Sequence, residues 1–132
     1  MSKKSLSIEY GKVGGCLFGI YQGGNMNLQI ASAWLERAHV GFSDIHQFAL
    51  QCRDAATAAG RESAALALLA ERAAAFTERY EGIAIPVSVV DEFLGKMRLE
   101  VKVLKDASGV SDAALLEALN AFAAKLAPTI FV

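Results

Sequence analysis

The stretch "RESAALALLAERAAAFTERYE", residues 61–81, decides the fold class. Its apolar residues recur at alternating steps of three and four, at Leu66, Leu69, Ala73, Phe76 and Tyr80. This spacing places them on one face of an α-helix. The heptad-like pattern lasts barely two heptads, which is shorter than an independent coiled coil needs. The stretch therefore predicts one helix of a compact bundle.

The composition of the chain favours the same fold class. Hydrophobic residues make up 54% of the 132 residues, against about 45 to 50% in a typical domain. Much of the excess is alanine, the residue with the highest helix propensity, concentrated in segments 55–75 and 113–127. A chain of this length is typical of one domain with one core. We therefore expect residues 1–132 to form a single, mainly α domain, a compact bundle of about five helices.

Two helices are predicted before residue 61. One begins at a cap, Asn25 or Asn27, and stops at Gly41. The next has Ser43 as its cap, ends near Gly60, and carries an apolar stripe at Ile45, Phe48, Ala49 and Cys52.

Two further helices are predicted after residue 81. A capping-box-like start, Ser88 to Asp91, precedes a stripe formed by Val90, Leu94, Met97, Val101 and Leu104. The last helix has Ser111 as its cap and Pro128 as its end, and its stripe is formed by Leu115, Leu119, Phe122 and Leu126.

Two segments leave strand structure open as an alternative. Glycines and β-branched or aromatic residues near the N-terminus predict a small β-hairpin, with strands near 5–10 and 13–21, although the glycine-rich segment 11–24 could instead be a binding loop. The segment "RLEVKV" alternates apolar and charged residues, so 98–104 fits a half-exposed strand as well as a helix. With a further strand near 128–132, the alternative fold is α+β.

Charge and hydropathy narrow the function classes. A net charge of −1 disfavours general affinity for nucleic acid. No apolar run reaches the roughly 18 residues of a membrane span, and Lys3 and Lys4 are not followed by a signal-peptide core. Cys16 and Cys52 lie among apolar neighbours, which favours reduced thiols over a disulfide framework. We therefore expect a cytoplasmic protein with no membrane contact.

The stretch "LKDASGVSDAALLEALN", residues 104–120, predicts two helices that meet at a turn. Gly109 can adopt a left-handed conformation there, and Ser111 can cap the second helix. The segment locally resembles the helix-turn-helix of bacterial repressors, with these positions matched: Leu104, Gly109, Val110, Ser111, Leu115, Leu119 and Asn120. The resemblance covers about 17 residues. It implies an alternative function as a nucleic-acid-binding transcriptional regulator.

The side chains that would read DNA depart from that pattern. The second helix offers Asp112, Leu116 and Glu117 on its exposed face, which are poor readers of base edges. Phosphate contacts would fall to Arg98, Lys102 and Lys105, which form a basic stripe if this segment is helical. Glu92, Glu100 and Asp106 lie near these cations. The simpler interpretation of the basic stripe is therefore a helix face that is exposed to solvent.

No constellation of residues predicts catalysis, a metal site or a cofactor. His39, His46 and Cys52 are the residues nearest to such a cluster, but their spacing does not bring three ligands together on one helix face. Cys52 lies on an apolar stripe, which favours burial over nucleophilic reactivity. We therefore expect a protein that is not an enzyme, with no cofactor.

The leading hypothesis is a non-catalytic protein-binding module. Apolar positions outnumber those that five short helices can bury in one small core, which indicates a surface covered by a partner. The candidate partner-binding residues are Trp34, Leu68, Leu116, Ile130 and Phe131. We expect a small regulatory or inhibitory protein that binds a protein partner and self-associates, as a homodimer, through an apolar helical surface.

Overall fold

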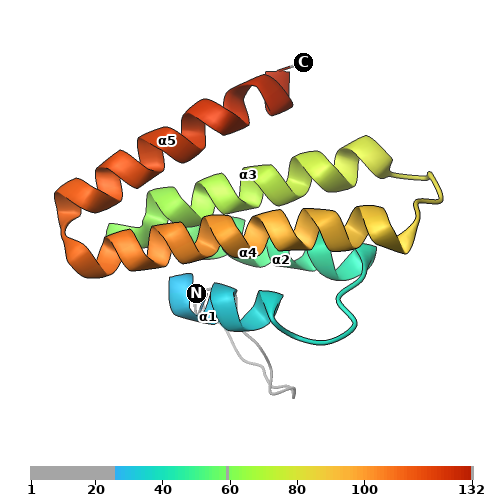
Figure 1. Cartoon of the computed structure of the whole chain (residues 1–132), viewed down its shortest axis with the longest axis horizontal. Helices are drawn as coiled ribbons and strands as arrows, with labels where there is room; N and C mark the ends of the chain where they lie inside the picture. Colours follow the sequence, from blue (N-terminus) through green and yellow to red (C-terminus); the bar gives the residue numbers. More distant parts are fainter. Residues whose placement is uncertain (1–25, 59, 132) are drawn as a thin grey trace, which may run out of the picture.

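Helices make up the regular structure of the described chain (Figure 1). The computed structural model describes residues 26–58 and 60–131, with side chains as far as Pro128. Its elements are α1 (Leu28–Leu35), α2 (Phe42–Ala56), the 3₁₀ helix η3 (Gly60–Glu62), α3 (Ser63–Tyr80), α4 (Val87–Val110) and α5 (Asp112–Phe131). The expected mainly α fold is therefore confirmed. None of these helices is both long and apolar enough to cross a lipid bilayer.

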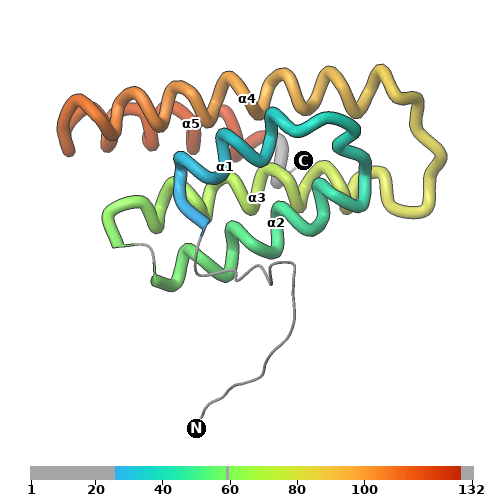
Figure 2. Tube along the Cα trace, turned by 90° about the horizontal axis from the view of Figure 1, so that it is seen from below, coloured from blue at the N-terminus to red at the C-terminus, as the bar shows by residue number. Residues whose placement is uncertain are grey.

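The helices form two hairpins and one short flanking helix. α2 and α3 pack closely as the first hairpin, and α4 and α5 form the second, with α5 folding back over α3 and α4 (Figure 1). The short α1 packs against α4. Figure 1 shows α1 and α5 on opposite sides of α4, and Figure 2 shows α4 along one edge of the bundle. This arrangement leaves one side of α4 turned toward solvent.

The core follows the predicted stripes of α2, α3 and α4. Every residue of the α2 and α4 stripes is buried, and Leu66, Leu69 and Ala73 of α3 are fully enclosed. Leu115, Phe122 and Leu126 bury one face of α5 in the same way. Each large apolar side chain removed from water stabilises the bundle by about 1.5 to 3 kcal/mol, and this burial holds the helices together.

Aromatic rings join α3 to its neighbours. Phe76 of α3 stacks on Phe93 of α4, with ring centroids 4.0 Å apart and planes inclined by 17°. Phe76 also contacts Tyr80, at 5.1 Å between centroids, and Phe42 of α2, at 6.2 Å. Phe76 therefore ties three helices together near one end of the bundle.

α1 has only eight residues, too few to be stable alone, and polar groups hold both of its ends. Asn27 caps its N-terminus by accepting a hydrogen bond from the Ile30 N–H at 2.8 Å, so Asn27 is the expected cap. Glu62 of η3 accepts a hydrogen bond from the Leu28 N–H at 2.9 Å. At the other end, Arg98 of α4 donates from Nε to the Leu35 carbonyl at 2.8 Å. A carboxylate at the N-terminus and a cation at the C-terminus both suit the helix dipole.

The strand alternative for residues 98–104 is wrong, because this segment lies in the middle of α4. The strand near 128–132 is wrong as far as Phe131, because α5 runs through Pro128 to that residue. Proline inside a helix removes one backbone hydrogen bond and crowds the carbonyl four residues earlier, but α5 nevertheless continues for three residues beyond Pro128. The predicted strands near 5–10 and 13–21, and the binding-loop alternative for 11–24, lie outside the described residues.

Several predicted helix ends are also wrong. Ser43 and Ser88 lie inside α2 and α4, whose N-caps are Gly41 and Pro86. Gly41 therefore begins α2 and does not end α1; its N–H donates to Asp44 Oδ2 at 2.9 Å.

The turn between α4 and α5 differs from the prediction in one residue. Gly109 does not adopt a left-handed conformation, and it lies within α4. Ser111 alone separates the two helices, with an extended backbone at φ −172° and ψ 167°. The Ser111 hydroxyl accepts a hydrogen bond from the Ala114 N–H at 3.0 Å, so its predicted capping of α5 is confirmed.

Candidate protein-binding surface on helix α4

Exposed apolar side chains gather on the outward face of α4. Leu99 is 65% exposed, Val103 53% and Val110 76%. They lie opposite Met97, Val101 and the rest of the buried stripe, because a helix turns by about 100° per residue. Leu116 of α5, 59% exposed, follows shortly after the turn. Large apolar side chains that stay in water on one helix face are typical of a surface that a protein partner covers.

A groove of about 300 Å³ lies between α4 and α5, next to this face. Leu99 and Val103 line it from α4, and Phe122 and Leu126 line it from α5. Phe122 and Leu126 are themselves buried, so the groove has an apolar floor. An apolar floor beside an exposed apolar helix face is what an amphipathic partner helix needs.

Charged side chains frame the groove. Lys125 of α5 forms an ion pair with Glu100 of α4, with Nζ and Oε2 2.6 Å apart. Arg72 of α3 lies half-buried with its guanidinium over the Phe93 ring, 5.1 Å from the centroid. Desolvation by burial lowers the pKa of Arg72, and the nearby Glu100 carboxylate acts in the opposite direction. A polar rim around an apolar centre is the usual anatomy of a protein interface.

The structure describes three of the five candidate partner-binding side chains, and these three lie on three different helices, α1, α3 and α5. Trp34 is half-buried, with its ring 4.9 Å from that of Phe48. Leu68 is also half-buried against the core, and Leu116 is exposed. The side chains of Ile130 and Phe131 lie outside the described residues.

Leu99, Val103 and Val110 are not among the partner-binding residues predicted from the sequence. In the strand alternative, Leu99 and Val103 are simply the apolar residues of an alternating strand. A signal for them was present: a second set of positions with helical spacing runs along α4, opposite the buried stripe.

The basic stripe of the nucleic-acid alternative makes contacts within the bundle. Arg98 holds α1 against α4 through its hydrogen bond to the Leu35 carbonyl. Lys102 pairs with Asp106 at 2.9 Å, and Lys105 lies 3.4 Å from the Ser32 hydroxyl of α1. Each of the three cations thus has a partner inside the chain.

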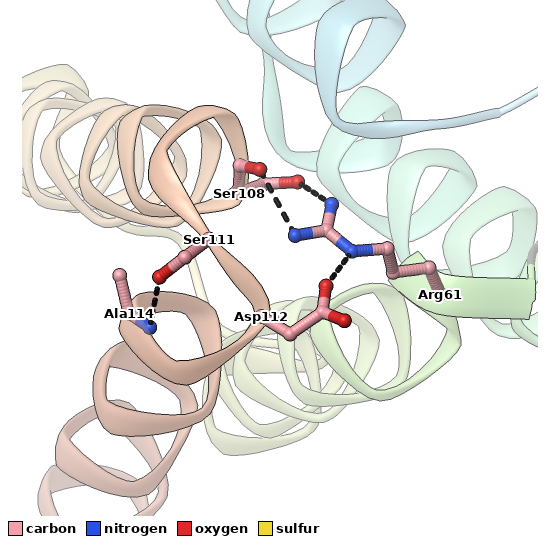
Figure 3. A network of polar contacts seen from close by, with 5 residues as sticks. All are labelled: Arg61, Ser108, Ser111, Asp112 and Ala114. Carbon is pink, nitrogen blue, oxygen red and sulfur yellow. Dashed lines mark hydrogen bonds and ion pairs between the residues drawn. The ribbon is translucent and has the colours of Figure 1, made fainter.

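One arginine fixes the turn of the helix-turn-helix-like segment (Figure 3). Arg61 of η3 donates from Nη1 to the Ser108 hydroxyl at 2.7 Å and from Nη2 to the Ser108 carbonyl at 3.0 Å. Its Nε also donates to the Asp112 carboxylate. Because the planar guanidinium makes all three bonds at once, Arg61 ties the start of α3 to the turn between α4 and α5.

We expect Arg61→Met to lower the free energy of unfolding by about 1 to 2 kcal/mol. The substitution removes the ion-paired hydrogen bond to Asp112 and the two hydrogen bonds to Ser108. Arg53→Met is the matched control. Arg53 contacts Glu71 at 3.6 Å in an exposed ion pair, so its loss should cost less than about 0.5 kcal/mol. Urea unfolding followed by circular dichroism measures both. Equal losses for the two variants would contradict the role given to Arg61.

The residues considered for catalysis or metal binding do not form a cluster. His39 and His46 are exposed, whereas Cys52 is fully buried on the α2 stripe. Burial raises the pKa of the Cys52 thiol to about 12. Within residues 26–58 and 60–128, no three His, Cys, Asp or Glu side chains lie close enough to hold a metal ion.

Comparison with protein-family models, with curated proteins and with solved structures finds no match to this chain.

Proposed function

We propose that this protein is a non-catalytic binding module that self-associates through the outward face of α4, of the kind found in small regulatory or inhibitory proteins. The observation that carries the proposal is the exposure of Leu99, Val103 and Val110 on one helix face. Such residues are stabilised when a partner removes them from water, at about 25 cal/mol for each Å² of apolar surface.

The groove between α4 and α5 supports the same proposal. Its apolar floor, formed by Phe122 and Leu126, continues the apolar face of α4 inward. A partner helix can therefore cover Leu99 and Val103 from the α4 side while it contacts α5. The cytoplasmic location stays a prediction, and so does the absence of catalysis.

The nucleic-acid alternative gains no specific support from the described residues. Arg98 and Lys105 are directed to α1, so two of the three cations of the basic stripe contact another helix of the same chain. The face of α4 that remains open carries apolar residues at its centre, which contact neither phosphates nor base edges as cations do.

Self-association is tested by size-exclusion chromatography with light scattering. We expect the apparent mass of the wild type to rise with concentration from 14.0 kDa toward twice that value. Leu99→Glu combined with Val103→Glu should remain monomeric, because a partner would have to bury four carboxylates without pairing them.

Leu50→Glu provides the matched control. Leu50 is an exposed leucine on α2, away from α4, so its replacement should leave the dimer unchanged. A wild type that is monomeric at every concentration from micromolar to near-millimolar would contradict the proposal. Equal weakening by both sets of substitutions would contradict the choice of surface.

A further inference from the structure

The outward face of α4 carries exposed residues at heptad spacing, three of them apolar and three charged. Six residues recur at steps of four, three, four, three and four, and all six are exposed: Glu92, Lys96, Leu99, Val103, Asp106 and Val110. The buried stripe from Val90 to Leu104 lies on the opposite side of the same helix. α4 therefore has two seams, one packed within the bundle and one without a partner among the described residues.

We propose that a second copy of this chain docks on this outer seam with the two α4 helices antiparallel and centred on Val101. In this register, Leu99 faces Val103 of the second copy. Lys96 faces the second copy's Asp106, and Glu92 faces its Val110. Because the pairing is symmetric, each contact occurs twice, as the two-fold symmetry of a homodimer requires. This inference rests on the proposed self-association and specifies its geometry.

The charges select the antiparallel arrangement. In a parallel pair, Lys96 would face Lys96 and Asp106 would face Asp106, and both contacts are repulsive. In the antiparallel pair, each copy instead places Lys96 against the Asp106 carboxylate of the other. The seam therefore has an apolar centre, Leu99 and Val103, between two attractive charge pairs.

The two charged residues are available for this contact. Lys96 contacts Glu92 at 3.5 Å and Asp106 contacts Lys102 at 2.9 Å, and both ion pairs lie within α4 and are exposed to water. Exposed pairs of this kind contribute little stability, so they can exchange for contacts with a partner or share them. Neither Lys96 nor Asp106 is held by a neighbouring helix through a salt bridge in the described part of the chain.

The outer seam is accessible to a second helix. α1 lies on one side of α4 and α5 on the other (Figure 1), and all six residues of the seam are exposed. Lys96, Leu99 and Val103 also line the groove toward α5, whose floor includes Phe122. Only a limited surface is covered in this way, so we expect a weak, concentration-dependent dimer.

Charge reversal tests the register. Lys96→Asp sets the new carboxylate against the Asp106 carboxylate twice, so the dimer dissociation constant should rise by about tenfold or more. Asp106→Lys should weaken the dimer similarly, because the new lysine of each copy then faces Lys96 of the other copy. The double variant, Lys96→Asp with Asp106→Lys, restores two attractive pairs and should associate about as tightly as the wild type. Sedimentation equilibrium measures all three, and circular dichroism verifies that each variant is folded.

Recovery in the double variant is specific to the antiparallel register. In a parallel pair the double variant would still oppose like charges, so its failure to recover overturns the register. Single variants that dimerise as tightly as the wild type would overturn it too, while leaving self-association through another surface intact. A wild type that never dimerises would overturn both this inference and the proposed function.

Chemical crosslinking provides an independent measurement. In a Cys16→Ser background, Leu99→Cys and Val103→Cys chains are mixed and treated with a short thiol crosslinker. The antiparallel register brings residue 99 of one copy beside residue 103 of the other, so the mixture should give several times more crosslinked dimer than either variant alone. Equal yields in the mixture and in Leu99→Cys alone would indicate a parallel pair and overturn the register.

Discussion

Replacement of Phe93 by alanine should lower the free energy of unfolding by about 3 to 5 kcal/mol, the usual cost of removing a buried phenylalanine side chain. Phe93 is only 5% exposed and stacks on Phe76, which in turn contacts α2 and the end of α3. The substitution also removes the ring under the Arg72 guanidinium. Since a domain of this size is stable by about 5 to 15 kcal/mol, such a loss should lower the urea midpoint strongly.

Two controls separate the stack from general effects of mutation. Phe93→Leu keeps most of the apolar volume but loses the aromatic contact, so it should cost about 1 to 1.5 kcal/mol. Leu50→Ala shortens an exposed side chain on α2 and should change stability by less than about 0.5 kcal/mol. A Phe93→Ala loss no larger than that of Leu50→Ala would show that the Phe76–Phe93 stack does not hold α3 to α4.

Hydrophobic spacing predicted the helices well but left α4 ambiguous. Val101 is buried and Leu99 and Val103 are exposed, so the alternation in "RLEVKV" comes from two opposite faces of one helix. The segment is helical because Leu94, Met97 and Leu104 belong to a buried stripe about four helical turns long. A short strand could not place these residues on one face. Leu99 and Val103, which made the segment look like a strand, belong to the outer seam. Apolar residues on an exposed helix face break the usual polar pattern of a surface, and such departures are expected at functional sites.

The ends of the helices were harder to predict because they depend on distant residues. The sequence around α1 contains Asn27 as a cap, but Glu62 and Arg98 reach its two ends from other helices. Similarly, the turn after Val110 is fixed by Arg61 from η3, so it needs no left-handed glycine. Such long-range polar contacts leave no periodic trace in a sequence.

The candidate surface could be predicted only in part. An apolar excess indicated a covered surface, and Leu116 is one candidate residue that is exposed. Trp34 and Leu68 are half-buried because neighbouring helices cover them. The hydrophobic spacing within each residue's own helix does not indicate this cover. Exposure depends on how the helices pack against one another, so the half-burial of Leu68 required the tertiary structure.

Cys52 should be almost unreactive toward thiol reagents while the protein is folded. Its thiol is fully buried, and burial raises its pKa from 9.0 to about 12. Because only the thiolate reacts, the shift alone lowers the reactive fraction at pH 8 by about a thousandfold. In the Cys16→Ser variant, Cys52 is the remaining thiol, so its labelling by an aromatic disulfide can be followed directly. Labelling in urea should be at least about a thousandfold faster than under native conditions.

The same pKa shift makes stability depend on pH in a defined direction. Well below pH 9 the Cys52 thiol is protonated in both the folded and the unfolded state, so it contributes no slope. Between about pH 9 and 12 the unfolded chain loses this proton while the folded chain keeps it. The free energy of unfolding should therefore fall by up to about 1.4 kcal/mol per pH unit in that window. The contribution of Cys52 is measured as the difference in slope between Cys16→Ser and the double variant with Cys52→Ala. Identical slopes, or rapid labelling of the folded Cys16→Ser variant at pH 8, would show that the thiol is not held in a dry core.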